Sequence, residues 1–331
     1  MAGTVEKLLR RLADGHEHSG PQLAADLGVT RAAVWKTVQQ LADLGLEVQA
    51  ERGKGYRLPA ALEFLGADLL EGQLEGCTRD SLESLEVFWS LDSTSDYLLR
   101  EPAVRPGFSR ACFAEFQTGG RGRRGRRWYA PIGHGICVSL SWSFASSPAN
   151  LSCLGLAAGV GVLRAAQRAG AREAQLKWPN DVVLDGKKLA GILIDVQGEA
   201  GGPLRVVVGV GLNYKFTAAA ASQIVAAGGL SPVAIADAAG DELWSRSKTA
   251  ATLVDELHGV LVEFSGRGFS GLAADWRAAD YLAGRRVVVT ADTGELAGIV
   301  RGIGADGRLQ LETEGGIQHI VNGDVSVRPV S

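Results

Sequence analysis

The spacing of apolar residues changes twice along this 331-residue chain, and each change limits what a segment can fold into. Residues 4 to 44 repeat apolar side chains at helical spacing, and the long middle part alternates helical and strand patterns. After Gly284, short strand-like runs are separated by Asp and Gly turns. With Pro59-Ala60-Ala61 as a linker, we predict three domains, at residues 1–60, 62–280 and 281–331.

The first domain has the pattern of a winged helix-turn-helix. Three short helices are predicted, with Ser19 and Thr30 capping the second and third and Gly28 in the turn between them. The stretch from Leu46 to Leu58 alternates loosely around a Gly-rich turn, which is typical of a hairpin. A short helix, a turn, a longer helix and a hairpin wing together predict DNA binding.

The residues expected to face DNA lie away from the apolar face of the third helix or in the hairpin. They are Arg31, Ala32, Trp35, Lys36, Gln39, Arg52 and Lys54. Arg and Lys suit phosphates and guanine edges, and Gln suits an adenine edge. Residues 1–58 carry eight Lys and Arg against seven Asp and Glu, and a net charge of +1 gives weak phosphate attraction. We therefore expect a dimer on a two-fold operator; a plain helical adaptor is the alternative.

The middle and last segments predict an α+β chain. Helices are expected at residues 150–169 and 249–264, and strands at 110–116, 136–144, 182–184, 188–195 and 204–212. Strand pairs between long helices favour a mixed sheet with helices on one side. Four short strands between residues 285 and 321 predict a small β-barrel.

Composition narrows the class of protein. The net charge of −3 does not indicate a basic coat, so any nucleic-acid contact must be local. The four cysteines have no metal-site or disulfide spacing, which fits a reducing cytosol; they are Cys77, Cys112, Cys137 and Cys153. The longest apolar run, residues 151–163, is too short to span a bilayer, so a soluble cytoplasmic protein without membrane contact is expected.

The most unusual motif is the run GGRGRRGRRWY at residues 119–129. Glycines allow tight folding around a ligand, and arginines offer forked, permanent charges that match phosphate or carboxylate. The run predicts an anion-binding loop, with a solvated basic loop as the alternative. It is followed by Lys177-Trp178-Pro179-Asn180-Asp181 and by KKLAGIL at residues 187–193.

These three motifs, in this order, resemble those of the biotin protein ligases. With the DNA-binding module, the chain resembles the bifunctional ligases that also repress biotin biosynthesis. The resemblance implies a class II synthetase-like central sheet and an SH3-like C-terminal barrel. It implies ATP and Mg²⁺ as cofactors, biotin as substrate, and biotinyl-5′-AMP as both intermediate and co-repressor. The implied partners are a biotin carboxyl carrier protein, operator DNA and, with the adenylate bound, a second copy of the chain.

The resemblance also assigns the biotin site. Its residues are Ser93, Thr94, Ser95, Gln117, Gly120, Arg121, Arg123, Trp128 and Lys188. Neutral donors and acceptors suit the polar but uncharged ureido ring. At position 95 the family usually has Asn, so Ser95 is a departure.

The catalytic residues implied by the resemblance are Lys188, Arg123 and Asp181, and Lys188 would span the biotin carboxylate and the α-phosphate. The implied nucleotide-binding residues are Arg121, Arg123, Lys177, Asn180, Asn213 and Arg328. For Asp181, a role toward Mg²⁺ or the incoming lysine and a simple turn-forming role stay open, and Mg²⁺ is expected mainly on the ATP phosphates. Trp178 either packs in the core or lines the site.

Two further segments carry expectations. Residues 216–229 match a segment that orders over the adenine, and Leu189–Asp195 is predicted to be an edge strand used for dimerisation. Two other functions remain open at this point. One is a ligand-sensing repressor without ligase activity, and the other is a lipoate-type ligase on the same fold.

Overall fold

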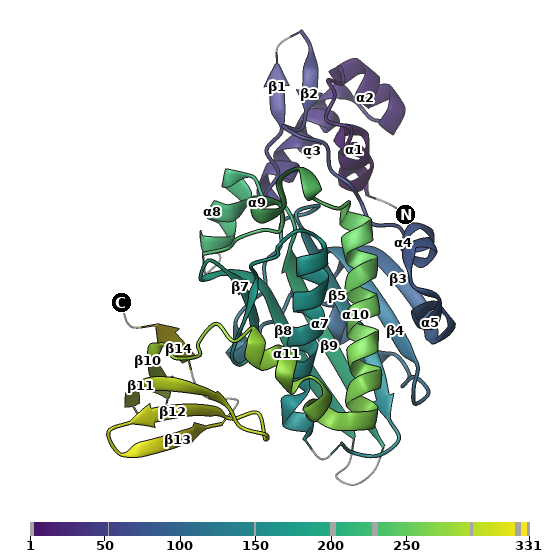
Figure 1. Ribbon diagram of the computed structural model, residues 1–331. Coiled ribbons are helices and arrows are strands. Elements are labelled where there is room, and N and C mark those ends of the chain that lie inside the picture. Colours follow the sequence, from purple (N-terminus) through teal and green to yellow (C-terminus); the bar gives the residue numbers. More distant parts are fainter. Residues whose placement is uncertain are drawn as a thin grey trace.

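The computed structural model describes residues 3–51, 53–148, 150–198, 203–226, 231–291, 294–321 and 326–329. Within these ranges no helix is both long and apolar enough to cross a bilayer. Figure 1 shows a small helical module at one end, a central sheet covered by long helices, and a second small sheet at the C-terminus.

The N-terminal module contains α1 (Thr4–Leu12), α2 (Gly20–Leu27), α3 (Arg31–Asp43) and the antiparallel pair β1 (Gln49–Glu51) and β2 (Gly55–Arg57). The predicted caps are confirmed: Ser19 Oγ accepts from Gln22 N, and Thr30 Oγ1 accepts from Ala33 N, each at 3.2 Å. Gly28 ends α2 in the left-handed conformation. The predicted winged helix-turn-helix is therefore present.

The central sheet has seven strands in the order β3-β4-β5-β9-β8-β7-β6. They are β3 (Leu82–Leu91), β4 (Ser109–Gln117), β5 (Gly135–Phe144), β6 (Gln175–Lys177), β7 (Asp181–Leu184), β8 (Lys187–Gly198) and β9 (Leu204–Asn213). The β3–β4 pair is parallel and the other pairs are antiparallel. The five predicted strands are confirmed, and β3 and β6 were missed.

Helices cover both faces of this sheet, so the expectation of helices on one side was wrong. The long helices α7 (Leu154–Arg168) and α10 (Arg246–Arg267) lie together on one face, with α11 (Ala273–Ala278) beside α7 (Figure 1). The short helix α6 (Thr94–Arg100) contacts β4, β5 and β9, and its Leu98 joins Cys112 and Val207 in a separate apolar cluster. Because every residue of β5 is buried, both faces of the sheet need cover.

The predicted edge strand Leu189–Asp195 is only partly at an edge. β8 pairs with β9 along Ala190–Gly198, and β7 covers its other side from Lys187 to Gly191. β8 therefore lies inside the sheet at its start. Beyond Ile192, its second side has no strand partner in the described ranges.

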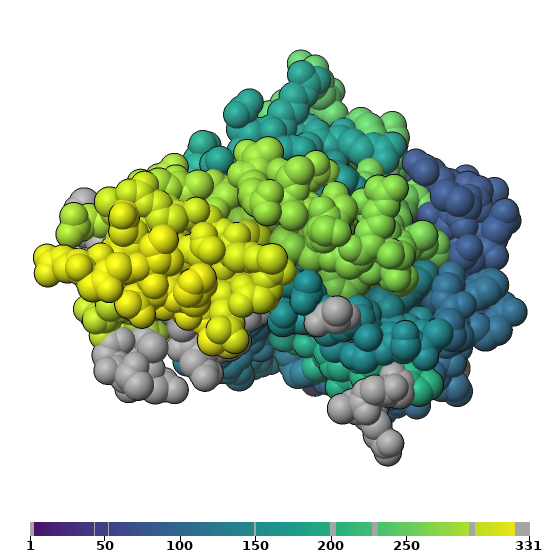
Figure 2. Space-filling model, turned by 60° about the horizontal axis from the view of Figure 1, so that its bottom comes forward, coloured from purple at the N-terminus to yellow at the C-terminus, as the bar shows by residue number. Residues whose placement is uncertain are grey.

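The C-terminal domain is a five-stranded antiparallel sheet in the order β13-β12-β11-β10-β14. Its strands are β10 (Arg286–Ala291), β11 (Gly294–Ile303), β12 (Leu309–Thr313), β13 (Gly316–Ile320) and β14 (Ser326–Pro329). The four predicted strands are confirmed, and β14 adds a fifth against β10. Figure 2 shows this yellow segment lying against the green segment that precedes it.

The remaining helices lie at the borders of the central domain. They are α4 (Ala67–Gln73), α5 (Gly76–Asp80), α8 (Ala218–Ala226) and α9 (Ala236–Ala239). α8 falls within the segment that we expected to cover the adenine, and residues 227–229 of that segment lie outside the described ranges.

A buried ion pair inside the central domain also holds the segment that follows the N-terminal module, through hydrogen bonds to Glu63 and Leu65. Arg246 Nη1 lies 2.8 Å from Glu115 Oε2, and both side chains are 1% exposed. The Arg246 guanidinium also donates to the carbonyl oxygens of Gly135 and Glu63. The Glu63 carboxylate accepts from the backbone N–H of Arg246 and Ser247 in the first turn of α10. A carboxylate at a helix N-terminus is favourable because the unpaired N–H groups and the helix dipole point toward it.

Candidate functional site

A cavity of about 360 Å³ lies between α6, the segment after β4, and strands β8 and β9. This volume is within the usual range for small-molecule sites. Most of the predicted ligand-binding residues line it, namely Ser93, Thr94, Ser95, Gln117, Arg121, Arg123, Trp128, Lys177, Asn180, Asp181, Lys188 and Asn213. The structure therefore brings all three motifs to one place. The side chain of Arg328 lies outside the described part of the chain.

One end of the cavity is polar but uncharged. Gln117 Oε1 accepts from Thr94 N at 2.8 Å, and the hydroxyl of Thr94 lies 2.7 Å from that of Ser139. Ser95 Oγ is 2.9 Å from the same Ser139 oxygen. Ser93 caps α6 by accepting from Asp96 N. Hydroxyl groups can both donate and accept, so this corner can satisfy a neutral polar ligand.

Two glycines of β9 form the floor beside this corner. A Cβ at Gly209 would lie 2.5 Å from Ser95 Oγ, and a Cβ at Gly211 would lie 2.0 Å from the Trp128 ring. No real Cβ tolerates such contacts without a shift of its neighbours. The two glycines therefore let α6 and the Trp128 indole approach the strand.

The Gly/Arg-rich segment folds as a short hairpin above the cavity. Trp128 N donates to Gly120 O at 2.9 Å, and Gly122 N donates to Arg126 O at 2.7 Å. Arg124 and Gly125 have positive φ at its tip. Gly120 is buried beneath the loop, and a Cβ there would lie 2.4 Å from Trp128 O. We infer that Gly120 shapes the hairpin and does not line the cavity.

The opposite end of the cavity carries the cations. Lys188 Nζ lies 2.7 Å from Asp181 Oδ1 and 5.6 Å from the centre of the Trp128 ring. Arg123 Nη1 donates to Asn180 Oδ1 at 3.3 Å. Asp181 is the first residue of β7, directly after the turn that contains Pro179. Its observed partner is Lys188, an interaction that the sequence reasoning did not consider.

Two other predicted residues have structural partners. Asn180 is hydrogen bonded to Ile192 through its backbone carbonyl and its side-chain amide, which fixes the KWPND turn to β8. Asn213 Nδ2 donates to the carbonyl oxygen of Lys188 at 3.0 Å. These contacts hold the backbone around Lys188, so both amides help to position the cationic end.

Trp178 has both of the roles that the sequence left open: it packs in the core and it lines the cavity. Its side chain is 1% exposed, and its Nε1–H donates to Gly307 O of the C-terminal domain at 3.0 Å. It also forms part of the cavity lining. Trp178 therefore connects the C-terminal domain directly to the wall of the site.

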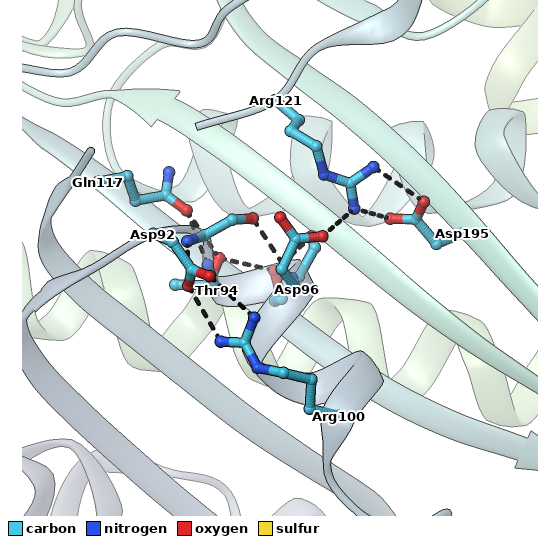
Figure 3. A network of polar contacts seen from close by, with 10 residues as sticks. Asp92, Thr94, Asp96, Arg100, Gln117, Arg121 and Asp195 are labelled. Carbon is cyan, nitrogen blue, oxygen red and sulfur yellow. Dashed lines mark hydrogen bonds and ion pairs between the residues drawn. The ribbon is translucent and has the colours of Figure 1, made fainter. Parts of the chain in front are cut away.

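Arg121 has a different environment from the other cations. Its guanidinium lies between Asp96 on α6 and Asp195 on β8, as Figure 3 shows. Burial alone would lower the pKa of Arg121, but its hydrogen bonds and charge interactions with Asp195 and Asp96 together outweigh burial and raise the pKa. Nearby, Arg100 at the end of α6 donates two hydrogen bonds to the carboxylate of Asp92, just before α6. These bonds lower the pKa of Asp92 to about 2.

Sequence reasoning missed two residues that build the site. Ser139 links Thr94 to Ser95. It is one of three serines at alternate positions of the otherwise apolar β5, so the pattern signals a polar face but does not single out Ser139. Arg205 on β9 donates to the carbonyl oxygens of Leu98 and Glu101 at the end of α6. It holds that helix against the sheet, and no local pattern marks it for this role.

The predicted DNA-facing residues lie far from this cavity in the sequence. Those on α3 are all exposed, namely Arg31, Ala32, Trp35, Lys36 and Gln39. Trp35 is 59% exposed, which is unusual for an indole. Lys54 is exposed and paired with Glu51 at 2.7 Å, and Arg52 lies outside the described residues.

Comparisons with known proteins agree with this architecture. Residues 87–213 match the biotin/lipoate A/B protein ligase family, residues 4–57 match a helix-turn-helix domain, and residues 283–328 match the biotin protein ligase C-terminal domain. The biotin protein ligase from Aquifex aeolicus, solved with biotin and ATP, superposes with a TM-score of 0.60. It covers 76% of this chain and 99% of its own at 24% identity, which shows a shared fold.

The curated relatives define the group more narrowly. The bifunctional ligase/repressor BirA of Escherichia coli is 37% identical over 97% of this chain and 96% of its own length. The biotin–[acetyl-CoA-carboxylase] ligase of Mycobacterium tuberculosis is also 37% identical, over 64% of this chain and 76% of its own. The chain therefore belongs to the biotin protein ligases, in the group of bifunctional ligase/repressor proteins.

Proposed function

We propose that this protein attaches biotin to a lysine of a biotin carboxyl carrier protein in two steps. In the first, a carboxylate oxygen of biotin attacks the α-phosphorus of ATP, which gives biotinyl-5′-AMP and releases pyrophosphate. In the second, the lysine amine attacks the acyl carbon, AMP leaves, and the amine loses a proton. The observation that carries this proposal is a cavity with a neutral polar end and a cationic end.

The neutral end suits the ureido ring of biotin. Thr94, Ser95, Gln117 and Ser139 offer hydroxyl and amide groups without a formal charge. The ring is polar and uncharged, so it needs hydrogen-bond partners and no ion pair. Ser95 already reaches Ser139, so its replacement of the usual Asn preserves a polar contact in this corner.

The cationic end suits the reacting groups. In the proposal, Lys188 lies between the biotin carboxylate and the α-phosphate, where a compact positive charge stabilises charge that develops during transfer. Arg123, above it in the loop, holds the adenylate and the pyrophosphate side. Asp181 orients the Lys188 ammonium, as their 2.7 Å contact supports, and accepts the proton of the incoming lysine.

The residues of the cavity fit a magnesium ion held by phosphates. Asp181 is the one carboxylate among the described residues that line the cavity, and no cluster of three potential metal ligands occurs in the described ranges. Mg²⁺ typically binds one or two carboxylates together with water and substrate phosphates. Bound there, the ion supplies positive charge to the phosphate oxygens, while the orientation of the substrates comes from the protein side chains.

We also propose that the protein represses transcription with biotinyl-5′-AMP as co-repressor. The supporting observation is the exposed face of α3, on which Arg31, Lys36 and Gln39 stand beside Trp35. In this proposal two copies pair through the part of β8 beyond Ile192, which gives two recognition helices for a two-fold operator. The biotin carboxyl carrier protein and operator DNA are then the two macromolecular partners.

Biotin-dependent exchange of pyrophosphate into ATP tests the ligase function. The parent protein should show exchange with biotin and not with lipoate. Lys188→Ala should reduce the rate by roughly 100- to 1,000-fold, as loss of a transition-state charge partner does. Arg123→Gly should release biotinyl-5′-AMP early and label lysines on unrelated proteins. Biotin binding without exchange would favour a sensing repressor, and exchange with lipoate would favour a lipoate-type ligase.

Sedimentation with and without biotinyl-5′-AMP tests the repressor function. The adenylate should convert the protein from monomer to dimer at micromolar concentration, in parallel with a rise in affinity for operator DNA. If operator affinity rises while the mass stays that of a monomer, dimerisation is not the switch.

A further inference from the structure

The Gly/Arg-rich loop is joined to two walls of the cavity through one side chain. Arg121 Nη2 lies 2.8 Å from Asp96 Oδ1 and 2.9 Å from Asp195 Oδ2, and Arg121 Nη1 lies 3.2 Å from Asp195 Oδ1 (Figure 3). The contact to Asp195 is therefore bidentate, which is the strongest geometry for an arginine–carboxylate pair. The guanidinium is enclosed by carboxylates on two sides.

The two carboxylates come from elements that build the site. Asp96 is in the first turn of α6, next to Thr94 and Ser95 at the neutral end. Asp195 is on β8, in the part that pairs with β9 alone, and 74 residues separate it from Arg121. Arg121 therefore bridges the loop, the helix that carries the neutral end, and the strand that carries Lys188.

Several other hydrogen bonds of the loop stay within the loop segment itself. The bonds from Trp128 N to Gly120 O and from Gly122 N to Arg126 O close the hairpin on itself. Arg127 Nη2 donates to Thr118 O, at the start of the same segment. These bonds shape the loop. The carboxylates of Asp96 and Asp195 attach it to α6 and β8, and Arg123 adds a single hydrogen bond at 3.3 Å to Asn180 of the KWPND turn.

We propose that Asp96, Arg121 and Asp195 form a clasp that holds the loop closed over the cavity. In this role Asp96 and Asp195 are positioning residues, and Arg121 binds protein carboxylates in place of nucleotide phosphate. The proposal rests on the proposed ligase function for its kinetic consequence only. A loop held in its closed form loses less conformational freedom when biotin binds, so the clasp strengthens binding without touching the reacting atoms.

Trypsin reports directly on the clasp, because the loop carries five arginines between residues 121 and 127. Asp195→Asn and Asp96→Asn should each speed cleavage within the loop of the full-length protein by roughly three- to tenfold, the size expected for partly exposed ion pairs. Asp275→Asn is the matched control: it breaks an exposed ion pair with Arg164 on the helical face, and its loop should be cleaved at the parental rate.

A double substitution separates the clasp from general loosening. In Arg121→Gln, cleavage after the remaining loop arginines, read by mass spectrometry, should also be faster. Adding Asp195→Asn to Arg121→Gln should have little further effect, because the contact is already lost. Parental cleavage in Asp195→Asn, or fully additive effects in the double variant, would overturn the proposal.

Pyrophosphate exchange then tests the consequence for the reaction. Asp96→Asn and Asp195→Asn should raise the KM for biotin by roughly three- to tenfold and leave kcat within about twofold, because the clasp acts on binding. Asp195→Glu, which keeps the carboxylate, should recover part of the loss. Faster cleavage with an unchanged KM would show that the clasp does not assist binding. Absence of exchange in the parent would refute the ligase function, while the trypsin result would still decide whether the clasp exists.

Discussion

The N-terminal module keeps an apolar core of its own, whereas the C-terminal sheet shares the core of the central domain. Leu8, Leu23 and Leu41 belong to a cluster whose buried members all come from the module except Ile132; partly buried central residues, namely Leu62, Phe64, Trp89 and Phe116, pack against it. Val287 and Leu311 of the C-terminal sheet belong to the same cluster as the central strands and helices. The two ends also differ in their polar contacts. A buried ion pair fixes the segment after the first module, and backbone carbonyls of residues 305–307 receive donors from the central domain at the other end.

The module with its own core has a further contact near the cavity. The hydroxyl of Tyr129, next to Trp128, donates to Gln223 of α8 at 3.2 Å. A Cβ at Gly45 of the N-terminal module would lie 2.2 Å from the same Gln223 oxygen. The turn after α3 therefore sits against two segments that border the site. The comparison shows that a domain with its own apolar core, such as the N-terminal module, can still contact segments that border the cavity.

Deleting each end tests the comparison with the largest expected effect. Removal of residues 284–331 should abolish cooperative thermal unfolding, because it exposes apolar surface of the shared core. Removal of residues 1–61 should leave a cooperative transition, because the lost core is mostly its own. Thermal denaturation by circular dichroism measures both. Equal melting behaviour of the two truncated proteins would break the comparison.

Among single substitutions, Glu115→Gln should cause the largest loss of unfolding free energy. It leaves the Arg246 charge buried without its partner, which typically costs about 3–5 kcal/mol of unfolding free energy. Urea denaturation measures the change. Glu312→Gln, which removes an exposed partner of Arg301, is the control and should change stability by less than about 1 kcal/mol. A similar small effect in both variants would show that the buried pair is not stabilising.

Asp280, just before the C-terminal domain, should make the stability of that side depend on pH. Burial raises the pKa of Asp280 to about 6, above its ordinary value of 3.8 in an unfolded chain. The folded protein therefore favours the protonated form, and stability falls as pH rises from about 4 through 6. The shift corresponds to at most about 3 kcal/mol. Asp280→Asn should match the parent near pH 4 and be more stable at pH 7, as urea denaturation at each pH will show. A gap that does not change with pH would contradict the assignment.

Trp178→Phe should have the smallest effect of the four. It keeps an aromatic ring in the core and removes the donor to Gly307 O, which leaves that buried carbonyl unpaired. The expected loss is about 1–3 kcal/mol of unfolding free energy, measured by urea denaturation. A variant as stable as the parent would mean that the link to the C-terminal domain is carried by packing alone.

Much of the fold could be predicted because it depends on local signals. Capping by Ser19 and Thr30 and the apolar runs of β5 and β9 follow from neighbouring residues. β3 was missed because its charges interrupt the apolar pattern, and β6 because three residues carry little pattern. The position of α6 on the second face depends on tertiary packing, which no local spacing encodes.

The candidate site divides in the same way. The loop and the KWPND and KKLAGIL motifs were found as short patterns, and the structure places them around one cavity. Pairs that join distant residues could not be found, since Arg121 and Asp195 are 74 positions apart. The contact of Lys188 with Asp181 depends on the β7–β8 hairpin, in which the strand register shifts between Val182 and Val183. No short sequence pattern indicates such a shift.

The floor glycines also limit how this site can diversify. An alanine at Gly209 or Gly211 would collide with Ser95 or Trp128, so the floor has almost no freedom to accept mutations. A change in ligand preference must instead come from α6, where the residues that face the cavity are not required to be glycine. Ser95, smaller than the Asn usual in the family, already stands at that wall. For selection of a ligase that accepts an enlarged biotin analogue, position 95 is therefore the place to begin a library, and positions 209 and 211 are to be left unchanged.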